Sequence, residues 1–233
     1  MFADFNNLLA ATLLFVLGHL LLSSLSVRKP LIQRFGEKGF RSIYSLVVAV
    51  AFVWMLLSYR SAPYLPVWEP PSWTLPLAMI AMVPAVLLFV IGLATPSPTA
   101  VGGERRLDVQ DARPPAHGIL SVTRHPFLCG VALFALAHLL ANGDLATIVL
   151  MAGLLLLSLA GMAHIDARRA KVLGPLWGPI ALSTSRVPFL AILQGRAALD
   201  LAGIGWLRFL AAAAVYLALV LLHPLLIGVP LVP

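Results

Sequence analysis

Long apolar stretches alternate with short polar segments along this chain. Six stretches approach the roughly 20 residues that an α-helix needs to cross a hydrocarbon layer about 30 Å thick. They cover residues 5–26, 41–59, 74–95, 126–142, 145–163 and 207–228. The fourth and fifth are separated only by Asn142, Gly143 and Asp144, which are typical of a turn, so we expect a helical hairpin. The pattern predicts an all-α fold, a polytopic membrane helical bundle of about six transmembrane helices that forms a single domain over residues 1–233.

Three segments between these stretches are too polar or too short to span a membrane. Residues 27–41 are expected to form a connecting loop. Residues 164–178 mix apolar and basic side chains, which is typical of an amphipathic helix lying at the membrane interface. Residues 186–197 are apolar but short, and we expect an interfacial or re-entrant piece there.

The composition agrees with a membrane protein. Hydrophobic residues make up 61% of the chain and charged residues only 11%, against roughly 25% charged in soluble domains. A single cysteine, Cys129, excludes a disulfide framework within the chain. The first residues show no basic region and no cleavage site of the A-x-A kind, so we expect the first apolar stretch to remain as a span.

The basic residues are distributed unequally between the two ends of the predicted bundle. Fifteen of the sixteen lysines and arginines fall on one side, and only Arg60 falls on the other. The positive-inside rule places the basic side in the cytoplasm. We therefore expect a multi-pass protein of the bacterial inner membrane with both termini in the periplasm. Because the positive charge lies in the loops between spans, it does not indicate nucleic-acid binding.

Two histidines interrupt the apolar stretches. His19 follows Gly18 in the first stretch, and His138 follows Ala137 in the fourth. An ionisable residue at membrane depth predicts a functional site, and a small neighbour allows a helix or a planar cofactor to approach. Counted from the basic side, His19 lies roughly 10 Å deep and His138 roughly 18 Å deep at 1.5 Å per residue. These depths permit a shared site, although each ring could instead bond a carbonyl or a serine across the bundle.

The densest polar cluster precedes the fourth stretch. Arg124 and His125 come directly before Pro126, which suits the first turn of a helix. The start of a helix favours anions, so this pair predicts a site for a carboxylate or phosphate, such as a cofactor propionate or a nucleotide. The alternative is an interfacial pair whose side chains reach the lipid head groups.

Several short motifs together resemble the NnrU family of membrane proteins, which is associated with denitrification and includes the plant zeta-carotene isomerases. The clearest is G-x-x-x-x-T-R-H-P at residues 118–126. The others are GHLLLSSLSVRKPL with His19, Ser23 and Arg28, ALAHLLANGD with His138, and the later HIDARRAKVLGPLW and SRVPF. Their joint order extends over most of the chain.

The resemblance implies a haem b protein. The axial histidines of the similar isomerases match His19 and His138, so we expect both to ligate one haem, with Ser23 as a hydrogen-bonding neighbour. The isomerases also have a cysteine three residues before the second ligand, where this chain has Ala135, and Cys129 is too far along the helix to replace it. The expected activity is isomerase or redox chemistry on a small or lipidic, carotenoid-like substrate, linked to nitrogen-oxide metabolism.

A second, more distant resemblance is to isoprenylcysteine and phospholipid methyltransferases, which also place Arg-His-Pro at the start of a membrane helix. It suggests S-adenosylmethionine as an alternative cofactor, held around Arg124 and His125. The paired glutamates of those enzymes are absent here, and Asp166 is the only acid nearby. A non-catalytic accessory protein that works through partner membrane proteins is a third possibility, so the residues alone leave enzymatic activity open.

The remaining histidines carry weaker predictions. His117 and His223 are expected outside the site, in a loop and at an interface. His164 and Asp166, two positions apart, do not share a helical face.

Overall fold

The structure is a computed structural model that describes residues 2–99, 114–229 and 231. The described residues form an all-helical fold. The long helices are α1 (Phe2–Ser23), α2 (Leu25–Ser61), α3 (Thr74–Ala94), α5 (Pro126–Ala141), α6 (Leu145–Leu173) and α10 (Trp206–Ile227). The short ones are α4 (Ile119–Val122), η2 (Gly174–Leu176), α7 (Trp177–Ser183), α8 (Leu190–Leu193) and α9 (Leu201–Ile204).

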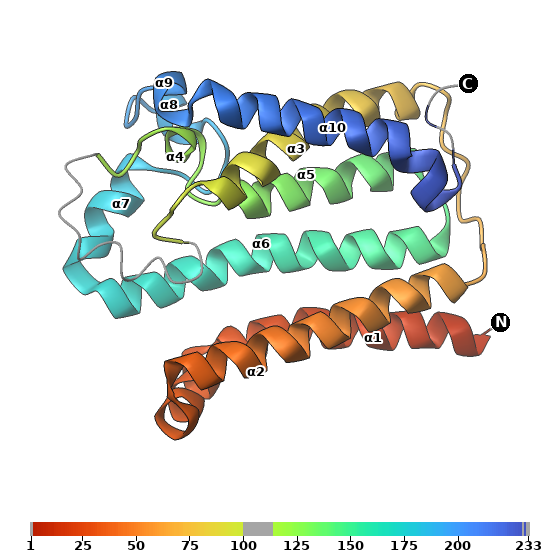
Figure 1. Cartoon of the computed structure of the whole chain (residues 1–233), viewed down its shortest axis with the longest axis horizontal. Helices are drawn as coiled ribbons and strands as arrows, with labels where there is room; N and C mark the ends of the chain where they lie inside the picture. Colours follow the sequence, from red (N-terminus) through yellow and green to blue (C-terminus); the bar gives the residue numbers. More distant parts are fainter. Residues whose placement is uncertain (1, 100–113, 230, 232–233) are drawn as a thin grey trace.

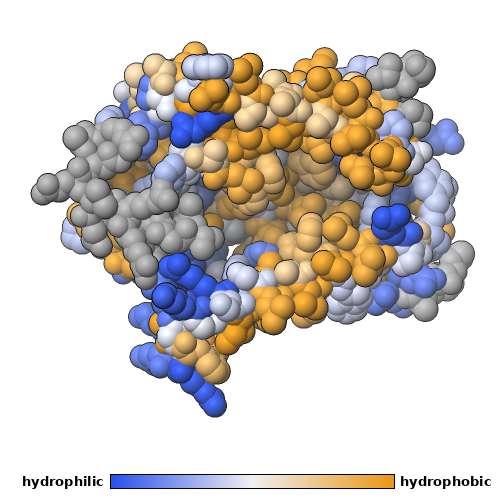
Figure 2. Space-filling view, in the orientation of Figure 1, coloured by the Kyte–Doolittle hydropathy of each residue, from blue (hydrophilic) through white to orange (hydrophobic). Residues whose placement is uncertain are grey.

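The prediction of an all-α membrane bundle is confirmed. Five helices, α1, α2, α3, α6 and α10, are long and apolar enough to cross a membrane, and α5 is a shorter apolar helix of 16 residues. Each of the six predicted stretches coincides largely with one of these six helices. The outer surface agrees with this assignment: α10 buries only Ala212, and Figure 2 shows hydrophobic side chains over much of the bundle.

Helix α6 lies in the middle of the arrangement (Figure 1). The α1–α2 pair packs on one side of it, and the group formed by α3, α5 and α10 lies on the other. Glycines allow the close contacts. A Cβ atom on Gly130 would lie 2.6 Å from the backbone nitrogen of Phe89, and a Cβ on Gly153 would overlap the Thr12 methyl group. Small residues have this role in membrane bundles, where van der Waals packing drives helix association.

The predicted hairpin between the fourth and fifth stretches is confirmed. The turn at residues 142–144 joins α5 to α6, and the Asp144 carboxylate caps α6 by accepting a hydrogen bond from the Thr147 backbone N–H at 2.9 Å. The proline-rich segment after α2 closes the same end of the bundle. There the Val67 N–H donates to the Gly143 carbonyl at 2.8 Å.

Two expectations about the polar segments were wrong. Residues 27–41 are helical and belong to α2, which bends at Gly36, where a φ of 71° suits a residue without a side chain. Residues 164–178 are not a separate interfacial helix, because α6 continues without a break to Leu173 and is followed by η2 and α7. Within residues 186–197 only the short α8 is helical, and an interfacial or re-entrant position for this segment stays a prediction. An apolar stretch shows which part of a helix lies in the membrane. It does not show where the helix ends, because polar residues can continue the same helix beyond the membrane.

Candidate functional site

The chain gathers its polar side chains in two neighbouring regions at one end of the bundle. This end carries the last turns of α1 and α6, the bend in α2 and the start of α5 (Figure 1). One region is a cavity between α1, α2 and α6, and the other is a closed cluster of arginines around Asp166. We call them the basic cavity and the Asp166 cluster. The basic Arg105, Arg106 and Arg113 lie outside the described residues.

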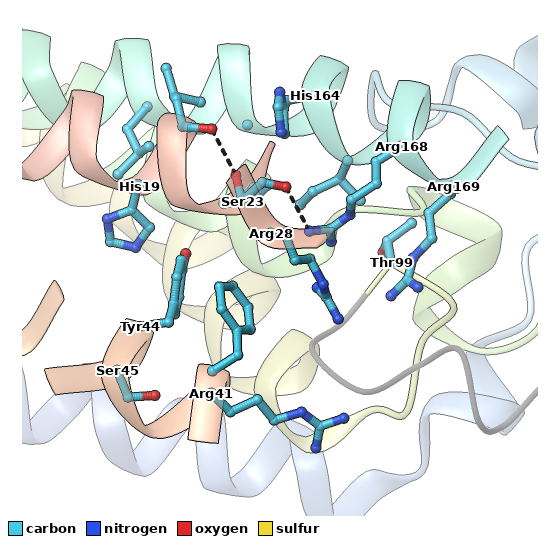
Figure 3. Close-up of a pocket in the computed structure, with 16 residues that line it drawn as sticks. His19, Ser23, Arg28, Arg41, Tyr44, Ser45, Thr99, His164, Arg168 and Arg169 are labelled. Atoms are coloured by element: carbon cyan, nitrogen blue, oxygen red, sulfur yellow. Dashed lines mark hydrogen bonds between the residues drawn. The ribbon is translucent and has the colours of Figure 1, made fainter. Parts of the chain in front are cut away.

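The basic cavity encloses about 280 Å³. Its polar lining contains His19, Ser23, Arg28, Arg41, Tyr44, Ser45, Thr99, His164, Arg168 and Arg169 (Figure 3). Its apolar lining contains Leu20, Phe40, Leu128, Leu157, Gly161 and Ile165. Pockets for small molecules commonly measure roughly 300–1,000 Å³, so this cavity suits one part of a larger ligand.

His19 is held in one orientation within the cavity. Its Nδ1 lies 3.2 Å from the Phe15 carbonyl oxygen one turn earlier in α1, and the ring meets Tyr44 edge-on with centroids 5.8 Å apart. Because a carbonyl only accepts, this contact requires Nδ1 to carry the proton. The neutral ring then presents Nε2 as an acceptor, the arrangement seen when a second hydrogen bond orients a ligating or catalytic histidine.

The last turns of α6 supply the other polar wall. The Arg168 guanidinium donates to the Ser23 carbonyl at 3.3 Å and so ties α6 to the end of α1. The Nε2 atom of His164 is buried and has no hydrogen-bond partner among the described residues. Buried polar atoms in folded proteins are nearly always paired, so an unpaired one at a cavity wall indicates a group that a ligand can satisfy.

His138 lies outside the cavity. Its Nδ1 donates to the Phe134 carbonyl at 2.8 Å, as His19 does to Phe15, but it is absent from the cavity lining. Contacts with α6 show the level at which α1 and α5 lie along the bundle. Thr12 of α1 lies beside Gly153 of α6, and Leu128 of α5 lies beside Gly161 of α6.

Since α1 runs parallel to α6 and α5 runs antiparallel to it (Figure 1), His19 is level with about residue 160 of α6 and His138 with about residue 151. At 1.5 Å per residue the two histidines are separated by roughly 14 Å along the bundle axis. Two axial ligands of one iron approach to roughly 4 Å, at ~2 Å for each metal–nitrogen bond. The structure therefore does not bring the predicted ligand pair together.

The Asp166 cluster contains the predicted Arg124 and His125. Arg124 binds the Asp166 carboxylate in a bidentate manner, with Nη2–Oδ2 at 2.7 Å and Nε at 3.1 Å from both oxygens. The ring Nε2 of His125 lies 2.8 Å from Asp166 Oδ1, and Arg186 Nε lies 2.7 Å from Oδ2. The anion that the start of α5 was predicted to hold is thus supplied by the chain itself, from α6.

The cluster fastens three segments to each other. Arg124 also donates to the Thr184 carbonyl at 3.1 Å and lies over the Trp177 ring, 5.9 Å from its centroid. His125 is 3% exposed, and burial lowers its pKa more strongly than its contact with Asp166 raises it. Bidentate arginine–carboxylate pairs with low exposure fix geometry as well as charge. The arrangement suits a structural clamp that holds the start of α5, the polar end of α6 and the segment before α8.

Of the five predicted site residues, the cavity receives two, His19 and Ser23. His117 and His223 each bond a nearby carbonyl, are half-buried and lie outside the cavity lining. Sequence reasoning did not assign the cavity arginines, Tyr44 or His164 to this site. The sequence signal that could have found His164 was its i, i+4 spacing from Arg168, which puts both residues on one face of α6. Asp166 lies on a different face, as its spacing of two positions from His164 predicts, and contacts His125.

The fold and site define a polytopic membrane protein with a basic cavity at one end of its helical bundle. A family model described as NnrU protein matches residues 7–231, and the chain belongs to this family. Two curated relatives are 15-cis-zeta-carotene isomerases of chloroplasts. The one from Arabidopsis thaliana is 34% identical over 114 residues, 48% of this chain and 31% of the relative. The one from Zea mays is 34% identical over 79 residues, 34% of this chain and 22% of the relative.

The matched regions thus cover less than a third of either relative's length. No solved structure matches the chain.

Proposed function

We propose that this protein is a membrane-embedded isomerase that acts on a lipidic, carotenoid-like polyene, and that the basic cavity is its reaction site. The observation that carries the proposal is the cavity itself, which joins an apolar wall to an oriented imidazole at the level of the membrane helices. The similarity to two carotene isomerases supports the reaction class.

The chemistry required of the cavity is modest. Isomerisation of a double bond changes no atom count, so a base that removes one proton from the polyene and then returns it is sufficient. His19 Nε2 is available as this base because Nδ1 carries the ring proton and donates it to the Phe15 carbonyl. Tyr44 lies against the His19 ring and supplies a hydroxyl at the same wall. Leu157 and Leu128 offer an apolar surface for the chain on either side of the reacting bond.

His138 does not line the basic cavity, so a haem b held jointly by His19 and His138 is not part of the proposed reaction site. No step of the proposed reaction passes through a haem. Haem binding itself stays a prediction from the family resemblance, and a Soret absorption band in protein purified from haem-replete cells tests it. The link to denitrification also stays a prediction, tested by nitrogen-oxide respiration in a deletion strain.

We further propose that the basic end of the bundle faces the cytoplasm of a bacterial inner membrane. The positive-inside rule supports this orientation, since Arg60 alone lies at the opposite end. A reporter fused after Pro233 is expected to be active in the periplasm. A reporter inserted near Gly102 is expected to be active in the cytoplasm, and reversed signals would refute the orientation.

The isomerase proposal is tested by supplying 15-cis-zeta-carotene to membranes that contain the protein and following the isomers by chromatography. The expected result is conversion above the rate of membranes without the protein. His19→Ala is expected to lower the rate by about 100-fold or more, the usual contribution of an acid–base group. His223→Ala changes a histidine outside the cavity lining, serves as the matched control and should retain the full rate. Equal rates with and without the protein would refute the proposal.

A further inference from the structure

One glycine in the wall of the basic cavity is not required by helix packing. Gly161 of α6 lines the cavity together with Leu157, one turn earlier, and His164, one turn later. We propose that Gly161 keeps the cavity open for a rigid, planar segment of the polyene, so that the size of residue 161 decides whether the substrate binds. This role of Gly161 rests on the proposed function, because it concerns the same cavity and the same class of substrate.

The two glycines of α6 differ in what surrounds them. A Cβ atom on Gly153 would lie 2.4 Å from the Thr12 methyl carbon, so the close approach of α1 favours a glycine there. A Cβ atom on Gly161 would meet only the Leu128 side chain among the described residues, at 3.6 Å, which is an ordinary van der Waals contact. The packing of the described helices therefore accepts a larger residue at position 161.

The conformation of α6 does not require Gly161 either. The residue lies in the interior of the helix, and its φ is negative, as it would be in alanine. Glycine is less favourable than alanine in a helix interior, because it loses more conformational freedom on folding. What glycine provides at this position is the space beside the backbone, and that space belongs to the cavity.

Gly161 lies at the end of the cavity that holds the proposed base. Because α1 runs parallel to α6 (Figure 1), His19 is level with about residue 160 of α6. Figure 3 shows His19 and Tyr44 together at this end of the cavity, away from Arg168. A side chain on residue 161 would therefore occupy space at the level where His19 would act.

The shape of a polyene matches this end of the cavity. Conjugated double bonds make a flat, stiff and apolar segment that cannot bend around an obstacle. Such a segment comes close to a helix backbone only where no side chain projects from it, which is a common reason for glycine beside a ligand. Leu20 of α1, Leu128 of α5 and Leu157 of α6 provide apolar contacts around the same space.

The test measures binding and stability separately, with the full chain purified in a neutral detergent. Bound 15-cis-zeta-carotene is measured by its absorption after unbound polyene is removed, and stability by the thermal unfolding midpoint. Gly161→Leu is expected to weaken polyene binding at least about tenfold, because its side chain overfills the space beside the backbone. Gly161→Ala is expected to weaken binding less and to keep the midpoint at or above the native value, because alanine favours the helix.

Ala163→Leu is the matched control. It adds bulk to the same helix at an exposed position outside the cavity lining, and it should leave binding unchanged. Native binding in either Gly161 variant, or equal losses in Gly161→Leu and Ala163→Leu, would overturn the proposal. A Gly161→Ala midpoint clearly below the native value would also overturn it, by showing that the fold requires the glycine. Native protein that binds the polyene without isomerising it would refute the proposed reaction alone, whereas native protein that binds no polyene would refute both.

Discussion

The Asp166 cluster and the basic cavity are built from the same residue types at the same end of the bundle, yet they are suited to different tasks. In the cluster, one buried carboxylate accepts hydrogen bonds from Arg124, His125 and Arg186, so the polar groups bond one another within the chain. In the cavity, polar and apolar side chains surround a space of about 280 Å³, and the buried Nε2 atom of His164 has no hydrogen-bond partner among the described residues. Side chains that bond one another fix the fold, whereas an unpaired buried polar atom at the wall of a cavity is suited to a ligand.

The largest expected effect comes from breaking the Asp166 cluster. Asp166→Ala leaves two arginines and a buried histidine without their shared carboxylate. Because removing one partner of a buried ion pair strands the others, we expect the free energy of unfolding to fall by about 3–5 kcal/mol. Chemical denaturation in detergent measures this loss. A decrease below about 0.5 kcal/mol, the usual range for surface substitutions, would show that the cluster does not hold the fold.

A smaller effect on stability is expected from the cavity. Arg41→Gln removes the ion pair of Arg41 with Glu37, whose side chains are 37% and 33% exposed. An exposed i,i+4 pair contributes about 0.3–0.5 kcal/mol, so the unfolding midpoint should change by less than that of Asp166→Ala. Denaturation of both variants under identical conditions checks the order. A larger loss from the cavity variant would reverse the assignment of roles.

The smallest effect concerns pH. Burial lowers the pKa of His125 below its ordinary value of 6.5, so the folded protein takes up this proton less readily than the unfolded chain. The stability that the neutral ring contributes is therefore fully present above pH 6.5 and is lost as the pH falls through the lowered pKa. Unfolding midpoints measured between pH 7.5 and pH 5 should decrease in the native protein and decrease less in His125→Gln. Parallel curves would show that His125 does not titrate on unfolding.

The sequence was sufficient for the bundle and insufficient for the site. Six apolar stretches predicted six helices because a membrane requires long uninterrupted apolar segments, and such segments can be recognised directly in the sequence. The polar end of α6 was missed because a helix continues past the membrane without any change in hydrogen bonding, and only hydropathy changes there. The polar part of α2 was missed because the chain is helical on both sides of the bend at Gly36.

The site depends on distances between helices, which no local pattern records. Arg124 and His125 form the most distinctive motif, but their partner Asp166 is 42 and 41 positions away, so the motif alone indicated an external anion. His19 and His138 look alike in their local sequence, yet the directions of α1 and α5 place them at different levels of the bundle. The cavity arginines come from two helices and became a set only through the packing of α2 and α6 around α1.

The central claim, that the Asp166 cluster holds the fold and the basic cavity is the reaction site, is tested most directly by one comparison. The unfolding midpoint and the isomerisation rate per folded molecule are measured for Arg124→Gln and for His19→Ala. The account predicts that Arg124→Gln lowers the midpoint but keeps the rate, because the cavity is intact. His19→Ala should lose the rate and lower the midpoint less. A His19→Ala variant that keeps the full rate, together with an Arg124→Gln variant that loses it, would contradict the account.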